Sequence, residues 1–308
     1  MRVGDVERAA ERIAGHARRT PVLEMSPGLF LKLETAQHSG SFKVRGGFNR
    51  ALAAREAGAL PEAGLIAASG GNHGLAVAYA ARALGVRAEI FVPTVSSPVK
   101  VAGLRALGAE VTQTGEIYAE AYEASAKRAA ATGALEVHAY DHPDVVAGQG
   151  TVGLEVLEQT GGVDTVLVAV GGGGLVAGIT AAVAGRARVV AVEPELIPTL
   201  NRALAAGGPV QVEVSGVGAD ALGASRIGRI AYEVTSAAGV GSLLVPDEAI
   251  IEARQELWRS CRLAAEPAGA AAFAALHSGA YVPAPGERVA VIVCGANTDP
   301  ATLGKRAG

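Results

Sequence analysis

The 308-residue chain is poor in aromatic residues, cysteine and lysine. Aromatics make up only 4% of it, so its buried cores must be built mainly from alanine, valine, leucine and isoleucine. Its two cysteines, Cys261 and Cys294, form neither a CxxC motif nor a disulfide framework, which favours a reducing, cytoplasmic location. Only five of its 27 basic residues are lysines, so few amines are available for chemistry.

Charge and hydrophobicity exclude several classes of protein. The formal net charge is −3 and no basic block occurs, so neither nucleic acid nor an anionic membrane surface is an expected partner. The charged, amphipathic start lacks the apolar centre of a signal peptide. Residues 166–185 are uncharged and long enough to span a membrane, but four consecutive glycines favour a buried strand, a turn and a short helix instead.

Short apolar runs alternate with helical patterns along the chain, which indicates βαβ units and parallel sheets covered by helices on both faces. Ligands of such sheets bind beyond the carboxyl ends of the strands. The predicted strands cover 29–34, 65–68, 88–93, 109–114, 135–140, 163–170, 187–194 and 287–297. The predicted helices cover 5–18, 41–57 (with Ser41 as its cap), 75–85, 100–107, 118–131, 151–160, 175–185, 247–263 and 267–276.

The segment AVGGGGLVAG joins a predicted buried strand to a helix through Gly171, Gly172, Gly173 and Gly174. Backbone N–H groups without side chains can converge on one anion at a helix N-terminus. No GK[ST] follows, which argues against a nucleotide P-loop. Glu193 lies 19 residues beyond Gly174, where an acid that binds a ribose would stand. A phosphate cradle, an NAD site and a tight structural turn all fit this pattern.

Two lysines are candidates for amine chemistry. Lys43 lies in SGSFKVRGG among small residues, and a buried lysine with a lowered pKa can form a Schiff base with a carbonyl. Lys32, in the predicted strand LFLKLE, is the rival amine. For Lys32 a structural role at a strand edge or in an ion pair is the favoured interpretation.

The segment ASGGNHG follows a predicted strand and offers Ser69 with a run of N–H groups that suit a carboxylate. Asn72 and His73 are suited to bind a ring oxygen or a substrate. A Ser69–His73 nucleophile–base pair is the alternative, but no GxSxG elbow or third member supports it. A helix cap with a hydrogen-bonded histidine is therefore favoured over that pair.

Cys294 ends the last predicted strand, within VIVCGAN. It is either a buried structural cysteine or a neutral hydrogen-bonding partner for a heteroaromatic nitrogen. No HExxH, Cys/His cluster or EF-hand pattern occurs, so no dedicated metal site is expected.

The motifs KLETAQHSGSFKVRG, ASGGNHG, AGQGT, VGGGGL, AVEP, AEPAGA and CGAN follow in this order. Together they resemble the fold-type II pyridoxal-phosphate enzymes, in particular the serine/threonine dehydratase and serine racemase family, over nearly the whole chain. The resemblance implies an α/β fold with two domains, mostly parallel twisted sheets and covering helices, similar to the tryptophan synthase β-like fold. The expected large cofactor-binding domain covers 1–52 and 143–308, and a small substrate-closing domain is inserted at 53–142.

By this resemblance, pyridoxal 5′-phosphate binds between the domains and Lys43 forms the Schiff base with it. Phe42 would pack at the ring, Asn72 would bond its hydroxyl, and Cys294 would face its nitrogen. The glycines at 171–174 would cradle the phosphate. The resemblance also assigns the substrate carboxylate to Ser69, Gly71, Asn72 and His73, and it places Gln149 and Glu266 in further active-site motifs.

The activity implied is that of an L-threonine dehydratase, a lyase that eliminates water from L-threonine or L-serine and gives 2-oxobutanoate or pyruvate and ammonia. Serine racemase and threo-3-hydroxyaspartate ammonia-lyase are alternatives within the family. An NAD-dependent oxidoreductase and a non-catalytic amino-acid-binding relative are alternatives outside it. A cytoplasmic homodimer or homotetramer is the expected form, and no isoleucine feedback is expected because the chain ends soon after Asn297.

Two departures from the family pattern refine these expectations. Racemases of the family carry a serine directly after the position of Ser69, where this chain has Gly70, so little racemisation is expected. The racemase-type cation site pairs the glutamate of the EP motif with a carboxylate six residues later. Here Glu193 is followed at that distance by Thr199, so no strong cation site is expected.

Overall fold

A computed structural model describes residues 1–303, and within that range the strands form two sheets. The larger has six strands in the order β1-β2-β10-β7-β8-β9, and the smaller has four in the order β5-β4-β3-β6. All neighbours pair in parallel except β1 and β2. The strands are β1 Val22–Ser26, β2 Leu29–Leu33, β3 Leu65–Ala68, β4 Ala88–Val92, β5 Glu110–Gln113, β6 Leu135–Glu136, β7 Thr165–Ala169, β8 Arg188–Pro194, β9 Gly241–Val245 and β10 Val289–Val293.

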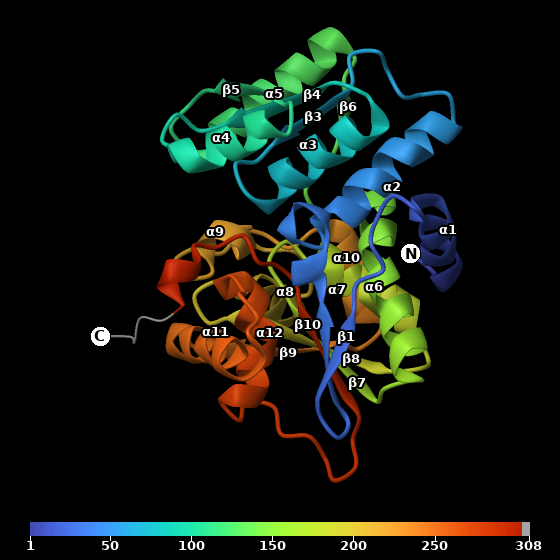
Figure 1. Ribbon diagram of the computed structural model, residues 1–308, viewed down its shortest axis with the longest axis vertical. Coiled ribbons are helices and arrows are strands. Elements are labelled where there is room, and N and C mark those ends of the chain that lie inside the picture. The colour runs from blue at the N-terminus through green and yellow to red at the C-terminus, as the bar shows by residue number, and fades with distance from the viewer. Residues whose placement is uncertain (304–308) are drawn as a thin grey trace.

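The helices cover both sheets and connect their strands (Figure 1). They are α1 Val3–Ile13, α2 Lys43–Glu56, α3 Asn72–Leu84, α4 Pro98–Ala106, α5 Tyr118–Thr132, α6 Pro143–Thr160, α7 Gly174–Val183, α8 Thr199–Ala206, α9 Ala219–Leu222, α10 Arg229–Ala237, α11 Asp247–Cys261 and α12 Pro267–His277, with the 3-10 turns η1 Glu34–Ala36, η2 His38–Gly40 and η3 Pro300–Thr302. The expected α/β fold is confirmed.

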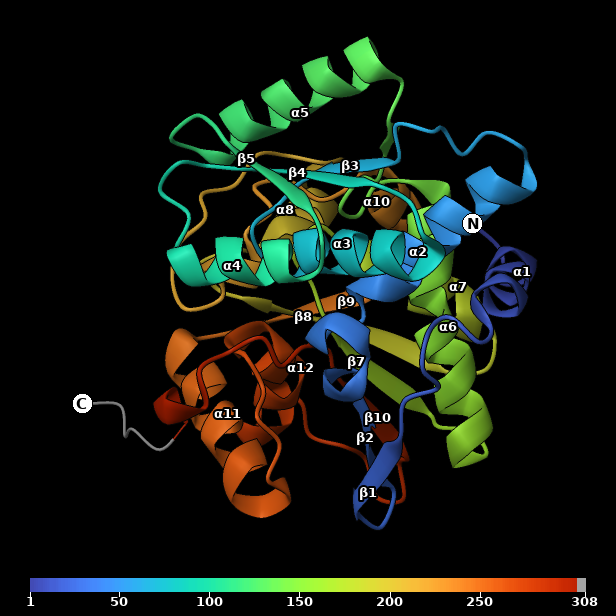
Figure 2. The ribbon, with the colours of Figure 1, turned by 45° about the horizontal axis from the view of Figure 1, so that its top comes forward.

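The smaller sheet lies between α5 on one face and α3 and α4 on the other (Figure 2). Successive side chains of a strand point to opposite faces, and β3 follows this rule. Leu65 and Ala67 join the core that contains Leu104 of α4, whereas Ile66 joins a separate cluster with Phe91. Both faces are apolar, so β3 is buried on both sides. Ser69 directly follows its carboxyl end.

The larger sheet carries α12 on one face and α7 with α6 on the other, as Figure 1 shows. Its central strands β7 and β10 are buried at every residue, as expected for parallel strands covered on both faces. Helix α12 is rich in alanine, and small side chains let it lie close to β10, β7 and β8. This dense core holds the carboxyl ends of β7 and β10, where Gly171 and Cys294 follow, in fixed positions.

Helices α6 and α7 approach closely through two glycines. A Cβ atom on Gly150 would lie 2.6 Å from the carbonyl oxygen of Gly178, and one on Gly178 would lie 2.4 Å from that of Val146. Neither position has room for a side chain, because backbone atoms cannot yield as a flexible side chain can. Since α7 begins directly after the glycine loop, this crossing also fixes where the loop lies.

Some predicted elements were wrong in their limits. The helix predicted over 5–18 ends at Ile13, because Gly15 adopts a left-handed φ of +78°. The strand predicted over 135–140 stops at Glu136, because the His138 side chain accepts hydrogen bonds from the N–H groups of Tyr140 and Asp141 and forms a turn. The helix predicted over 151–160 already begins at Pro143.

Other elements were not predicted at all. The edge strands β1 and β9 have irregular, partly exposed patterns, and the helices α8, α9 and α10 are only 8, 4 and 9 residues long. The predicted cap at Ser41 was wrong, because Ser41 is extended and bridges Gly295, and α2 begins after Phe42 without a side-chain cap. Between residues 1 and 303, no helix combines the length and the apolar character that a membrane span requires.

The division into domains at 1–52 with 143–308 and at 53–142 remains a proposal. The strands of the smaller sheet, from Leu65 to Glu136, fall inside the proposed insert. Helix α2 runs through the proposed boundary at 52/53 and packs on both α6 and α3, so a motion of the insert would bend or carry this helix.

The α6–α7 crossing predicts that Gly150→Ala destabilises the protein by about 2 kcal/mol or more, because the added methyl group must displace backbone atoms. The measurement is the denaturant midpoint of unfolding. Gly208→Ala is the matched control, since a Cβ at Gly208 would meet no atom within 4 Å. An unchanged midpoint for Gly150→Ala would show that the crossing is not as tight as described.

Candidate active site

A cleft with a volume of about 560 Å³ opens beyond the carboxyl ends of β3 and β7. It is lined by residues 68–73 and 219–225, with Lys43, Tyr140 and Gly172. A smaller adjoining pocket shares part of this lining and adds Phe42, Gly173, Gly174, Glu266 and Cys294. The structure therefore brings together residues that lie far apart in the sequence, from Phe42 to Cys294.

Lys43 is the first residue of α2, and its half-buried side chain lines this cleft. Its Nζ atom donates to the carbonyl of Ala139 at 2.8 Å and lies 5.3 Å from the centre of the Phe42 ring. Burial lowers the pKa of Lys43 to about 8, although the nearby Cys294 and Glu266 act in the opposite direction. An appreciable fraction of this amine is therefore neutral, and hence nucleophilic, close to neutral pH.

Lys32 has a different environment. Its side chain is fully buried, and Nζ donates to the carbonyl of Thr20, the carboxylate of Glu155 and the amide oxygen of Gln159 at 2.7, 2.5 and 2.8 Å. Burial lowers the pKa of Lys32, while the carboxylate of Glu155 opposes that shift. All three protons of the ammonium have acceptors, so the prediction of a paired lysine is confirmed.

The glycine loop leaves no space for side chains. A Cβ on Gly172 would lie 2.3 Å from the Tyr140 ring, and one on Gly171 would lie 2.7 Å from the carbonyl oxygen of Leu222. Gly173 has a φ of +86°, and α7 begins at Gly174. The N–H groups of the first turn of a helix have no acceptor within the helix, so they are available to an anion.

Asn72 and Glu266 meet at the boundary between the cleft and the smaller pocket. The Asn72 amide donates to Glu266 Oε1 at 2.6 Å, and its oxygen accepts from Asn297 at 2.7 Å. Burial raises the pKa of Glu266 to about 7, although the hydrogen bond from Asn72 acts against that rise. The predicted contact of Asn72 with a ring hydroxyl would have to share this amide with Glu266 or Asn297.

Cys294 lies at the far side of the smaller pocket, where β10 ends. Its thiol is buried and donates to the carbonyl of Ala268 at 3.4 Å. Burial, together with the charge of Glu266, raises the pKa of this thiol well above its usual value. Cys294 is therefore neutral at physiological pH, as a hydrogen-bonding partner of an uncharged ring nitrogen must be.

The Ser69–His73 loop forms the opposite wall of the cleft. The Ser69 hydroxyl accepts from the N–H of Gly71 at 3.2 Å, and α3 begins at Asn72 with its first N–H groups facing no helical acceptor. The His73 imidazole instead bonds the Val137 carbonyl at 2.7 Å, and burial lowers its pKa to about 3. This agrees with the favoured hydrogen-bonded histidine, whose imidazole is already occupied by Val137.

Gln149 does not line the cleft in the part of the chain that the structure describes. It lies behind Lys43, where its amide donates to the Lys43 carbonyl at 3.5 Å and its Oε1 atom is buried without a partner. Tyr140, Lys100 and Asp220 also line the cleft, although no motif in the sequence singled them out. The wrong strand over 135–140 concealed Tyr140, while Lys100 and Asp220 pair across 120 residues, which no local motif reveals.

Glu193, the acid that would bind the ribose of NAD, cannot reach a ligand. Glu193 is fully buried, and its carboxylate accepts hydrogen bonds from the N–H groups of Leu200 and Asn201. The hydroxyls of Thr199 and Ser242 occupy the same carboxylate. A ribose has no access to Glu193, so the structural basis of the NAD alternative is removed.

The buried amine, the anion-binding glycine turn and the neutral thiol define an α/β enzyme whose site fits a phosphorylated, heteroaromatic aldehyde. The glycine turn must present backbone alone, because protein atoms occupy the place of every side chain there, and the amine beside it is the nucleophile that an aldehyde requires.

The chain belongs to the family of pyridoxal-phosphate dependent enzymes, whose sequence model matches residues 13–295. The expected cofactor, pyridoxal phosphate, is thereby confirmed, as is the expected family.

The similar proteins differ in their substrates. An L-threonine ammonia-lyase of Thermotoga maritima is 36% identical over 274 residues, which cover 88% of this chain and 67% of the relative. A phenylserine dehydratase of Ralstonia pickettii is 37% identical over 307 residues, which cover 96% and 93%. The solved structure of maize serine racemase has a TM-score of 0.91 at 30% identity and covers 98% of this chain and 95% of its own.

The pKa of Lys43 predicts how the cofactor-free protein captures added pyridoxal phosphate. Because only the neutral amine attacks an aldehyde, the capture rate should rise with pH through about 8, below the ordinary lysine value of 10.5. Stopped-flow absorbance measures this rate, and Lys43→Ala, which lacks the amine, is the control. A rate that rises only near 10.5 would contradict the burial of Lys43.

Proposed function

We propose that this chain is an L-threonine ammonia-lyase that also accepts L-serine and releases 2-oxobutanoate or pyruvate with ammonia. The observation that carries the proposal is the position of the buried Lys43 amine, which lies in the cleft that the glycine loop and the Ser69–His73 loop line together. The similarity to an L-threonine ammonia-lyase over 88% of the chain supports it.

We assign the cofactor contacts as follows. Lys43 would hold the aldehyde, Phe42 would support the ring, and the N–H groups of Gly171, Gly172, Gly173 and Gly174 would bind the phosphate. Asn72 would face the ring hydroxyl, and Cys294 the ring nitrogen. When bound, pyridoxal phosphate supplies an electron sink that acidifies the α-proton of an amino acid and lets its β-substituent leave.

The chain's own residues would then bind the substrate and move its proton. The N–H groups at the start of α3, with Ser69, would hold the substrate carboxylate. The Lys43 amine, with its pKa lowered to about 8, is a suitable base for the α-proton at neutral pH. Glu266 holds the Asn72 amide in place, and Gln149 lies behind the Lys43 backbone.

The neutral thiol favours elimination over transamination. A thiol that stays protonated supplies no counter-charge for a cationic ring nitrogen, so electron density is not stored in the ring for long. A β-hydroxyl group can leave promptly under these conditions.

We further propose that the protein is cytoplasmic, as its two unpaired cysteines suggest. We also propose that it forms a homodimer or homotetramer, as expected from its family.

A keto-acid assay across L-threonine, L-serine and threo-3-hydroxyaspartate tests the proposed function. We expect the highest kcat/KM with L-threonine, and at least about a thousandfold loss in Lys43→Ala, because both the cofactor link and the base are removed. A higher kcat/KM with threo-3-hydroxyaspartate would transfer the assignment to that ammonia-lyase. Cofactor-loaded protein without turnover of any of the three would leave the binding-protein alternative.

Gly70 predicts the balance between elimination and racemisation. Gly70 bears no group that could give a proton to the substrate, and a Cβ there would have no neighbour closer than 3.6 Å, so a serine fits. Gly70→Ser should raise D-serine formation from L-serine by about a hundredfold, the usual effect of one positioned acid–base group. Gly70→Ala, which adds the Cβ without the hydroxyl, is the control and should form no more D-serine than the unchanged chain. Equal rates of D-serine formation in Gly70→Ser and Gly70→Ala would contradict the prediction.

A further inference from the structure

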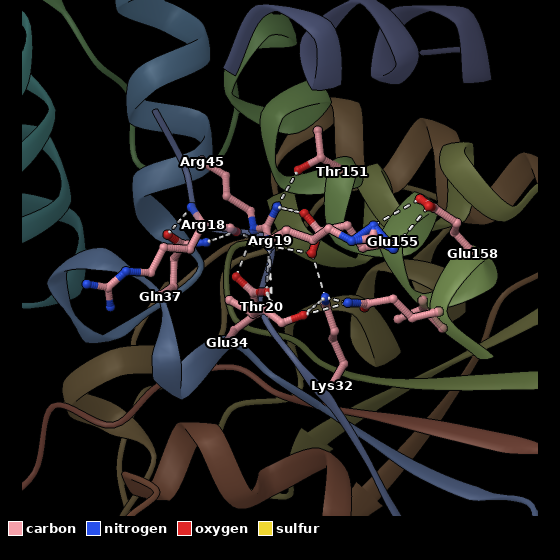
Figure 3. Close-up of polar contacts among 12 residues, drawn as sticks. Arg18, Arg19, Thr20, Lys32, Glu34, Gln37, Arg45, Thr151, Glu155 and Glu158 are labelled. Carbon is pink, nitrogen blue, oxygen red and sulfur yellow. Dashed lines mark hydrogen bonds and ion pairs between the residues drawn. The ribbon is translucent and has the colours of Figure 1, made fainter. Parts of the chain in front are cut away.

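Two residues beyond Lys43, the Arg45 guanidinium is buried in a network of charges (Figure 3). Arg45 is 1% exposed, and Glu34 and Lys32 are not exposed at all. Glu155 is the fourth charged member, with 16% of its side chain exposed. The two cations and two carboxylates balance one another, so the cluster has no net charge. We call these four residues the Arg45 network.

Arg45 uses its whole donor set in this network. Its Nε and Nη2 atoms donate to the two oxygens of Glu34, both at 2.8 Å. Its Nη1 and Nη2 atoms donate to the two oxygens of Glu155 at 2.6 and 2.9 Å, and Nη1 also reaches Thr151 at 3.1 Å. Burial opposes the positive charge, but the two carboxylates outweigh it and raise the pKa of Arg45. Two bidentate pairs fix a planar guanidinium in position and orientation.

The network joins the elements that carry the site. Glu34 follows β2, which pairs with β10, the strand that Cys294 follows. Glu155 belongs to α6, which packs against α7. Helix α7 begins in the glycine loop. Arg45 lies in the first turn of α2, two residues after Lys43. One guanidinium therefore connects the backbone beside the amine to both of the elements that the amine must face.

Besides Arg45, the start of α2 is restrained by backbone contacts, since Ser41 bridges Gly295 and a Cβ on Gly148 of α6 would lie 2.7 Å from the Arg45 carbonyl oxygen. Phe42 caps the helix without a side-chain hydrogen bond, and Gln149 reaches the Lys43 carbonyl only at 3.5 Å. The N–H of Phe42 donates to the Cys294 carbonyl at 3.2 Å. Stability alone does not require charges here, since well-packed apolar side chains often replace a buried ion-pair cluster at no cost in stability.

We propose that Arg45, through Glu34 and Glu155, is a positioning residue that holds the first turn of α2 so that the Lys43 amine faces the glycine loop. This inference rests on the proposed role of Lys43 as the cofactor-binding amine. Arg45 touches neither the cleft nor the smaller pocket, so it acts through the helix backbone and not on the reacting atoms.

The test separates positioning from stability with a charge-balanced variant. Arg45→Met alone leaves Glu34 buried without its partner, which should lower the unfolding temperature. Arg45→Met combined with Glu34→Gln removes one charge of each sign and should recover most of that loss. Arg87→Met, which removes an exposed arginine from its ion pair with Glu110, is the matched control. It should change neither the unfolding temperature nor the rate of cofactor capture.

The readout is the capture of added pyridoxal phosphate by the cofactor-free protein, followed by borohydride reduction and peptide mapping. The double variant should capture the cofactor on Lys43 roughly tenfold more slowly or worse, because a small misplacement of a reacting group has a large effect on its rate. Hydrogen exchange of the backbone amides at 42–47 should also become faster in it. If Arg45→Met and the double variant do not fold, Arg45→Lys, which keeps the charge but not the fork, should show the same two effects.

Capture and amide exchange equal to those of the unchanged chain, in a folded double variant or in Arg45→Lys, would overturn the positioning role while leaving the proposed function intact. Reduction of the cofactor onto a lysine other than Lys43 in the unchanged chain would overturn the proposed function and, with it, this inference. Peptide mapping of the unchanged chain therefore tests the proposed function, and capture and amide exchange in the variants test the positioning role.

Discussion

The site depends on the burial of one amine without a carboxylate directly bonded to it. Removing an ammonium group from water disfavours its charge, and the hydrogen bond from Lys43 to the Ala139 carbonyl restores only part of what is lost. The same chain shows the opposite solution at Lys32, whose buried ammonium has three acceptors, one of them a carboxylate. Burial alone therefore does not make a lysine reactive, and the missing counter-charge decides which of the two amines can attack an aldehyde.

The fold supplies the remaining groups at the ends of its parallel strands. Gly171 follows β7, Cys294 follows β10 and Ser69 follows β3, so an anion-binding turn, a neutral thiol and a carboxylate-binding loop converge on Lys43. The tight α6–α7 crossing and the Arg45 network hold these elements in fixed positions relative to one another. The chemistry at Lys43 is thus determined by packing and charges that lie outside the cleft.

The sequence predicts much of this site, because the ASGGNHG and VGGGGL segments are local, and their chemistry follows from a strand, a turn and a helix in succession. It predicts less wherever a role depends on distant partners. Arg45 and Glu155 are 110 residues apart, and nothing in either neighbourhood shows that they pair. Tyr140 was hidden by an apparent strand that the His138 side chain ends, and the edge strand β1 has only an irregular, half-exposed pattern.

The central claim is that Lys43, and not Lys32, is the amine that carries the cofactor. The most direct measurement reduces the purified, cofactor-loaded protein with borohydride and locates the added mass by peptide mapping. The account predicts a single modified peptide that contains Lys43, with Lys32 unmodified. Modification at Lys32, or a Lys43 peptide of unchanged mass in a protein that retains its absorbance, would contradict it.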